Sequence, residues 1–94
     1  MQPWPFDQQA NVACITTRQV IEDGLPILRV VHYADDHSWA FTCGTSNATE
    51  DGRVILMAEA LAIDASIAEV ADLLPGWGAY RDGIDAAWVR ILET

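Results

Sequence analysis

Two histidines, two aspartates and a cysteine stand close together in the sequence, and all have side chains that bind zinc or perform acid–base chemistry: His32, Asp35, Asp36, His37 and Cys43. Imidazole nitrogens, carboxylate oxygens and thiolate sulfur are the usual zinc ligands. However, two histidines separated by four residues, with two aspartates between them, match no established zinc motif. A core histidine followed by a solvated turn explains the pattern better. We therefore expect no metal and no cofactor, and keep a small metal-binding or enzymatic domain using His32, His37 and Cys43 as an alternative.

Nucleophilic catalysis by a cysteine requires a base or a cation beside the thiol, and the sequence identifies no such neighbour for Cys14 or Cys43. Two cysteines in a chain without an export signal are usually reduced and buried rather than paired. The carboxylates form no spaced pair that singles out an acid and a base. We therefore expect no catalytic residues.

The charge balance is the most informative property of the composition. The chain has 14 acidic residues against five arginines and no lysine, with a formal net charge of -9. Such a field repels nucleic acids and anionic membranes, and it speeds the encounter with a basic protein. A simpler interpretation is that the charge only keeps a small domain soluble.

With 94 residues the chain is long enough for one modest core, so we expect a single domain over residues 11–94. In residues 1–10, Pro3, Pro5, Gln8 and Gln9 predict an extended N-terminal arm. No apolar stretch reaches the ~20 residues of a membrane helix, and the N-terminus does not resemble a signal peptide. A cytoplasmic location is the expectation.

Alternating apolar residues predict strands at 12–16, 26–33, 39–44 and 53–57. We expect the strand at 26–33 to be central with both faces covered, and to form a hairpin with 39–44. The segment 16–21 is compatible with either a strand continuation or one helical turn. Polar residues predict surface loops at 34–38 and 45–52.

A helix is predicted after the fourth strand, because four apolar residues repeat at helical spacing: Ile67, Val70, Ala71 and Leu74. Asp64 can cap its start, and Ser66 with Glu69 offers a competing capping box. Pro75 and Gly76 end it. A last hairpin is predicted from 77–81 and 86–92. The sequence thus predicts an α+β fold, with an antiparallel or mixed sheet of about five to six strands and one main helix packed on it.

The aromatic residues are expected mainly in the core, with one exception. Trp4 lies between two prolines, so it either packs back on the domain or marks a contact with another chain. A self-associating structural module that uses its aromatic residues is therefore a further alternative. The expected core aromatics are Trp39, Phe41, Trp77, Tyr80 and Trp88.

The sequence contains SWAFTCG at 38–44, a longer segment at 51–82 that ends in PGWGAYRD, and a late tryptophan, Trp88. Together these resemble an uncharacterised bacterial family of the kind found among immunity proteins of polymorphic toxin systems. The resemblance covers residues 12–90 and rests on packing and turn residues such as Trp39, the Asp51 and Arg53 pair, and the LPGW segment at 74–77. Ala65 departs from the pattern, where a proline is expected. The resemblance implies a non-catalytic protein that binds and neutralises a cognate toxin.

If such a partner is basic, the two polar loops are the expected contact surface, since a meander would bring both to one end of the sheet. Their carboxylates would raise the association rate. The predicted partner-binding residues are Asp35, Asp36, Glu50 and Asp51. The alternative is that both loops are simply solvated turns.

Overall fold

The computed structural model describes residues 4–44 and 49–93. In these residues the strands are β1 (Ala13–Thr17), β2 (Arg29–His32), β3 (Trp39–Thr42), β4 (Gly52–Leu56), β5 (Trp77–Tyr80) and β6 (Val89–Leu92). The α-helices are α1 (Arg18–Ile21) and α2 (Met57–Ile63), and the 3₁₀ helices are η1 (Thr49–Asp51) and η2 (Ala65–Val70).

The described strands form one six-stranded sheet in the order β4-β1-β3-β2-β5-β6. The β1–β3 pair is parallel and the other four pairs are antiparallel, so the sheet is mixed. The predicted hairpins β2–β3 and β5–β6 are both present, with His32 opposite Trp39 and Gly78 opposite Ile91. The α+β prediction is confirmed. The ambiguous segment at 16–21 ends β1 and then makes one helical turn, α1.

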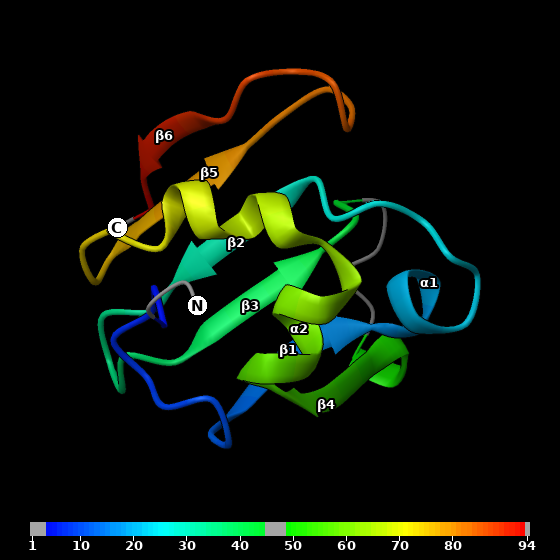
Figure 1. The fold of residues 1–94 in the computed structure, drawn as a ribbon, viewed down its shortest axis with the longest axis horizontal. Coiled ribbons are helices and arrows are strands. Elements are labelled where there is room, and N and C mark those ends of the chain that lie inside the picture. Colours follow the sequence, from blue (N-terminus) through cyan, green and yellow to red (C-terminus); the bar gives the residue numbers. More distant parts are fainter. Residues whose placement is uncertain (1–3, 45–48, 94) are drawn as a thin grey trace.

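The helical segment covers one face of the sheet (Figure 1), but it is not one continuous helix. α2 starts where alanine, leucine and glutamate replace β-branched residues, and the Glu59 carboxylate accepts a hydrogen bond from the Leu56 amide at 2.9 Å. Asp64 then takes an extended conformation and accepts from the Ser66 amide at 3.0 Å, so it caps η2. The competing cap by Ser66 is therefore wrong.

The predicted helix end is also corrected at one position. Ile67, Val70 and Ala71 are buried as predicted, but Leu74 is 67% exposed and Leu73 is buried in its place. Because η2 ends at Val70, the helical spacing no longer applies at 74. Gly76 turns the chain with a φ of 89°, a conformation that favours glycine.

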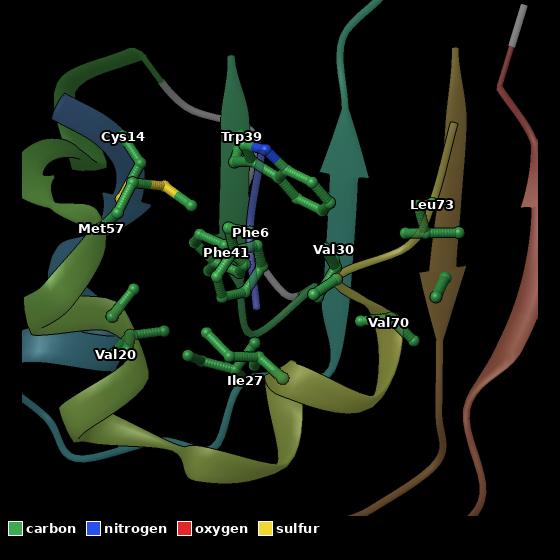
Figure 2. Close-up of a cluster of buried hydrophobic side chains, with 14 of the residues drawn as sticks. Phe6, Cys14, Val20, Ile27, Val30, Trp39, Phe41, Met57, Val70 and Leu73 are labelled. Carbon is green, nitrogen blue, oxygen red and sulfur yellow. The ribbon is translucent and has the colours of Figure 1, made fainter. Parts of the chain in front are cut away.

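The core lies between the sheet and the helical segment (Figure 2). Trp39 is fully buried, with its ring 5.0 Å from that of Phe6 and 6.0 Å from that of Phe41. Phe6 belongs to the segment expected to be an extended arm, yet it is buried among core side chains. Trp4 packs back against Phe6 with 5.8 Å between ring centroids. Residues 4–8 are therefore fastened to the sheet rather than separate from it.

β2 is an inner strand, as predicted, but only one of its faces is covered. Val30 and His32 are buried towards the helices, whereas Arg29 and Tyr33 on the opposite side are exposed. The expectation of two covered faces is wrong because the helical segment packs on one side of the sheet only. Among the described residues, no helix is long and apolar enough to cross a membrane.

Candidate functional site

The side chain of His32 is buried and packed as part of the fold. Its ring stacks on Trp39 at 4.0 Å and 12°, and its Nδ1 lies 2.8 Å from the Leu73 carbonyl oxygen, which fixes that nitrogen as the donor. The Nε2 atom lies 3.2 Å from a carboxylate oxygen of Asp7 but outside hydrogen-bonding geometry. The other oxygen of Asp7 accepts from the Trp39 indole nitrogen at 2.8 Å. This cluster joins the N-terminal segment, β2, β3 and the end of the helical segment.

The other candidate metal ligands do not converge on His32. His37 is exposed in the β2–β3 turn, with its ring 6.0 Å from that of His32. Cys43 is buried just beyond the end of β3 that lies away from this turn. Asp36 accepts from the Ser38 amide at 3.0 Å, and its hydrogen bonds with Ser38 lower the pKa of the carboxyl. Within residues 4–44 and 49–93, no group of three or more possible ligands could hold a metal ion.

The buried thiol of Cys14 is a poor nucleophile. Burial, together with the nearby charge of Glu59, raises its pKa from 9.0 to about 11. At pH 7 on the order of one molecule in ten thousand would carry the thiolate, and the side chain is buried from reagents. Cys14 is not bonded to Cys43.

Arg81 anchors the β5 end of the sheet to the helical segment. Its side chain is 2% exposed, and its guanidinium forms a 2.6 Å ion pair with Asp64. It also donates to the Ile27 carbonyl at 2.9 Å and to the Ser66 hydroxyl at 2.9 Å, and it lies 4.2 Å above the Trp88 ring. Arg81, which ends the PGWGAYR segment at 75–81, is therefore part of the core. Its guanidinium N–H groups all donate to acceptors of this chain.

The structure separates the four carboxylates predicted to bind a partner. Asp35 and Asp36 lie in the β2–β3 turn, whereas Glu50 and Asp51 lie in η1 before β4. The two loops precede and follow the single strand β3, so they lie at opposite ends of the sheet, and the expectation that they share one end is wrong. Asp51 pairs with Arg18 at 2.8 Å and accepts from Gln19 at 3.0 Å, while Asp35, Asp36 and Glu50 are exposed.

Every arginine of the chain is engaged by a carboxylate of the same chain. The pairs are Arg18 with Asp23 and Asp51, Arg29 with Glu93, Arg53 with Glu22, Arg81 with Asp64, and Arg90 with Asp72. Eight exposed carboxylates have no arginine partner in the described structure, namely Asp7, Asp35, Asp36, Glu50, Glu59, Glu69, Asp82 and Asp85. The negative charge is therefore presented to solvent, while the positive charge is neutralised internally.

The sheet face away from the helices, called the open face below, is apolar and exposed. Register places Val54, Ile15, Ala40, Val31, Gly78 and Ile91 in one row across all six strands. The large exposed side chains at open-face strand positions are Ile15, Val54, Leu56, Tyr80 and Val89, and Tyr33 continues the open-face side of β2. A hollow of about 490 Å³ on this face is lined by Arg29, Tyr33, Asp35 and Glu93, among others.

One ion pair crosses the open face. Glu93 follows β6, and its carboxylate accepts from Arg29 Nη2 at 2.9 and 3.0 Å, while its side chain lies over Gly78. A Cβ at position 78 would meet the Glu93 carboxylate and would lie 2.8 Å from the Val30 carbonyl oxygen. Gly78 therefore provides the space in which this pair lies flat on the sheet.

Sequence reasoning missed both the burial of Arg81 and the open face. Alternation at 77–81 places Arg81 on the same side as Ala79, and that shared face was the available signal. For the open face, the available signal was again alternation, which places Tyr33 on the same side of its strand as the charged Arg29, and Tyr80 on the same side as Gly78. Comparison of the chain with protein-family models, curated proteins and solved structures found no match.

Proposed function

We propose that this chain acts by stoichiometric binding to a basic partner protein and has no catalytic activity of its own. The observation that carries the proposal is the charge arrangement: all five arginines are engaged within the chain, and within residues 4–44 and 49–93 eight exposed carboxylates have no arginine partner. A field of one sign on a small rigid domain attracts an oppositely charged protein and orients it before contact.

The resemblance to immunity proteins of polymorphic toxin systems supports a more specific proposal, in which the partner is a toxin that the chain neutralises. A toxin that acts on nucleic acid has a basic surface, which an acidic protein can cover. The absence of catalysis is supported by the raised pKa of the Cys14 thiol and by the packing of His32 against Trp39. A cytoplasmic location is part of the proposal, and the buried free thiol of Cys14 is typical of a reducing compartment.

The proposed contact residues are still Asp35, Asp36, Glu50 and Asp51. Their positions in the fold give them different roles. Asp35 and Asp36 form one acidic end of the sheet, and Glu50 belongs to the other. Asp51 holds Arg18 and Gln19, so its role is to position η1. The surface that a partner contacts therefore either extends along the whole length of β3, from one acidic loop to the other, or includes only one of the two loops. Exposed carboxylates of this kind mainly raise the association rate.

The experiment uses the product of the gene immediately upstream, the expected position of a cognate toxin. Calorimetry should give one-to-one stoichiometry, and stopped-flow association should slow as salt screens the charges over about 8 Å at physiological ionic strength. Replacing Asp35 and Asp36 by asparagine, and separately Glu50 by glutamine, tests the two ends. At least one of these variants should associate roughly 3- to 10-fold more slowly.

The matched control replaces Asp23 and Asp72 by asparagine, which removes the same charge as the Asp35 and Asp36 variant. These two carboxylates already pair with Arg18 and Arg90, so their loss should change the association rate less. Equal slowing by the control would assign the effect to net charge alone. Binding of the upstream product with no dependence on salt or on any of these carboxylates would contradict the proposed acidic contact.

A further inference from the structure

The open face of this acidic chain carries few carboxylates: Asp35 at the rim of its hollow and Glu93, which pairs with Arg29. At the strand positions that point to this face, the residues are apolar, small or hydroxylated, apart from Arg29. Among the described residues, the Glu93 carboxylate lies over Gly78 of β5, and Arg29 neutralises it. Glu59 and Glu69, by contrast, are exposed on the helical segment that covers the opposite side. Exposed apolar faces of this extent mark contact surfaces.

We propose that two copies of this chain associate through their open faces to form a two-fold symmetric dimer. A basic partner gains little on this face, because the carboxylates that would attract it lie mainly on the other side and in the loops. Because the helical segment covers only one side of the sheet (Figure 1), two sheets packed through their open faces would place their helical sides away from each other. Layers about 10 Å thick separate their carboxylates by more than about 20 Å, well beyond the screening length.

The centre of the open face carries the residue types that dominate protein contacts. Arg29 lies directly opposite Tyr80 in the β2–β5 register, and Tyr33 extends the same side of β2. Arginine and tyrosine are enriched at the energetic centres of interfaces. Arg29 uses only Nη2 towards Glu93, and its Nε and Nη1 have no partner in the described ranges. A second copy would bring its own Glu93 and tyrosine hydroxyls as acceptors.

The size of the face predicts a reversible dimer. Six strands spaced about 4.8 Å apart, each of four or five residues, give a sheet face of roughly 24 by 15 Å. Stable dimers bury about 800 Å² on each copy, which a face of this size does not reach even with its flanking side chains. We therefore expect a weak, reversible dimer rather than a permanent one.

Sedimentation of the purified chain alone, from about 5 to 500 µM, tests the dimer. We expect a reversible monomer–dimer equilibrium that is unchanged or slightly strengthened when salt rises from about 0.05 to 0.5 M, because the remaining repulsion between copies is screened. Ile15→Glu and Tyr80→Glu, on two inner strands, should each raise the dissociation constant at least tenfold. Circular dichroism of each variant reports whether it folds, and either variant alone is sufficient for the test.

Leu74→Glu is the matched control, since it adds the same charge at an exposed leucine outside the strands, in the connection between η2 and β5. It should leave the dissociation constant unchanged within about twofold. A chain that stays monomeric up to about 500 µM overturns the proposal. So does a dimer that tolerates Ile15→Glu and Tyr80→Glu while folded, because association would then use a strand edge or the helical side. The test involves no second protein, so its outcome is independent of the proposed basic partner.

Discussion

The guanidinium of Arg81 and the carboxylate of Asp64 meet at 2.6 Å in the interior of the protein, joining the start of η2 to the end of β5. Asp64 simultaneously caps η2 through the Ser66 amide, and Arg81 donates to the backbone carbonyl of Ile27. One ion pair thus fixes the break between α2 and η2, the entry to β2 and the exit from β5.

Removing one partner of this pair should be costly. We predict that Arg81→Met lowers the free energy of unfolding by about 3 to 5 kcal/mol, because it leaves the Asp64 charge without its cation in a largely buried site. Denaturant unfolding measures the change. Arg90→Met is the control, since the Arg90–Asp72 pair is exposed, and it should cost less than about 1 kcal/mol. Equal losses in the two variants would show that burial of the Arg81 pair has no energetic consequence.

Gly78→Ala should destabilise the sheet by about 1 to 3 kcal/mol. The added Cβ would lie 2.8 Å from the Val30 carbonyl oxygen and would displace Glu93 from Arg29. Thermal melting measures this loss. Gly83→Ala is the matched control, because no heavy atom lies within 4 Å of a Cβ at that position. If both variants melt alike, the close approach at Gly78 is not a constraint on the fold.

The strands and turns were predictable because their signals are local. Alternating apolar residues identified β2, β3 and β5, and Pro75 with Gly76 marked the turn that the φ of Gly76 confirms. The division of the helical segment was not predictable in this way. It depends on Asp64 bonding to Arg81, which lies 17 positions further along the chain. Helical periodicity carries no information about such a long-range partner.

The candidate site was less predictable than the fold for a topological reason. Loops that flank one strand lie at its two ends, so Asp35 and Glu50 are separated by the length of β3. The open face depends on which side of the sheet the helices cover, and alternation alone treats the two sides as equivalent. Val31 and Val30 look alike in the sequence, yet only Val30 is fully buried.

Trp39 and Trp77 should differ in their contributions to stability. Trp39 is fully buried and stacked on His32, as the sequence predicts, so Trp39→Ala should cost about 3 to 5 kcal/mol. Trp77 is only partly buried at the edge of the core, and Trp77→Ala should cost roughly 1 to 3 kcal/mol. Denaturant unfolding of both variants gives the comparison. A larger loss at Trp77 would mean that its contacts near Pro75 dominate the packing.

Cys14 should make stability fall at alkaline pH. Burial raises the pKa of its thiol from 9.0 to about 11, so the folded state keeps a proton that the unfolded state releases. The contribution of this thiol to the free energy of unfolding is fully present below pH 9. It is lost as pH rises towards 11, which lowers the free energy of unfolding by roughly 2 to 3 kcal/mol. Unfolding midpoints from pH 8 to 11 should therefore fall more steeply for the wild type than for Cys14→Ala. Parallel profiles would show that the thiol does not contribute to this loss.

Phe6 should stabilise the fold far more than Trp4, although both belong to the same N-terminal segment. Phe6 is buried with its ring edge-on to Trp39 and Phe41, at 5.0 and 5.8 Å, so Phe6→Ala should cost about 3 to 4 kcal/mol. A loss of 1 kcal/mol lowers the melting temperature of a domain of this size by about 4 to 8 °C, which makes the effect large in a thermal melt. Trp4 is 36% exposed, contacts Phe6 and donates to the Gln8 carbonyl at 2.6 Å, so Trp4→Ala should cost about 1 kcal/mol. If Phe6→Ala melts like the wild type, residues 4–8 do not contribute to the core, and the extended arm expected from the sequence is the better description of this segment.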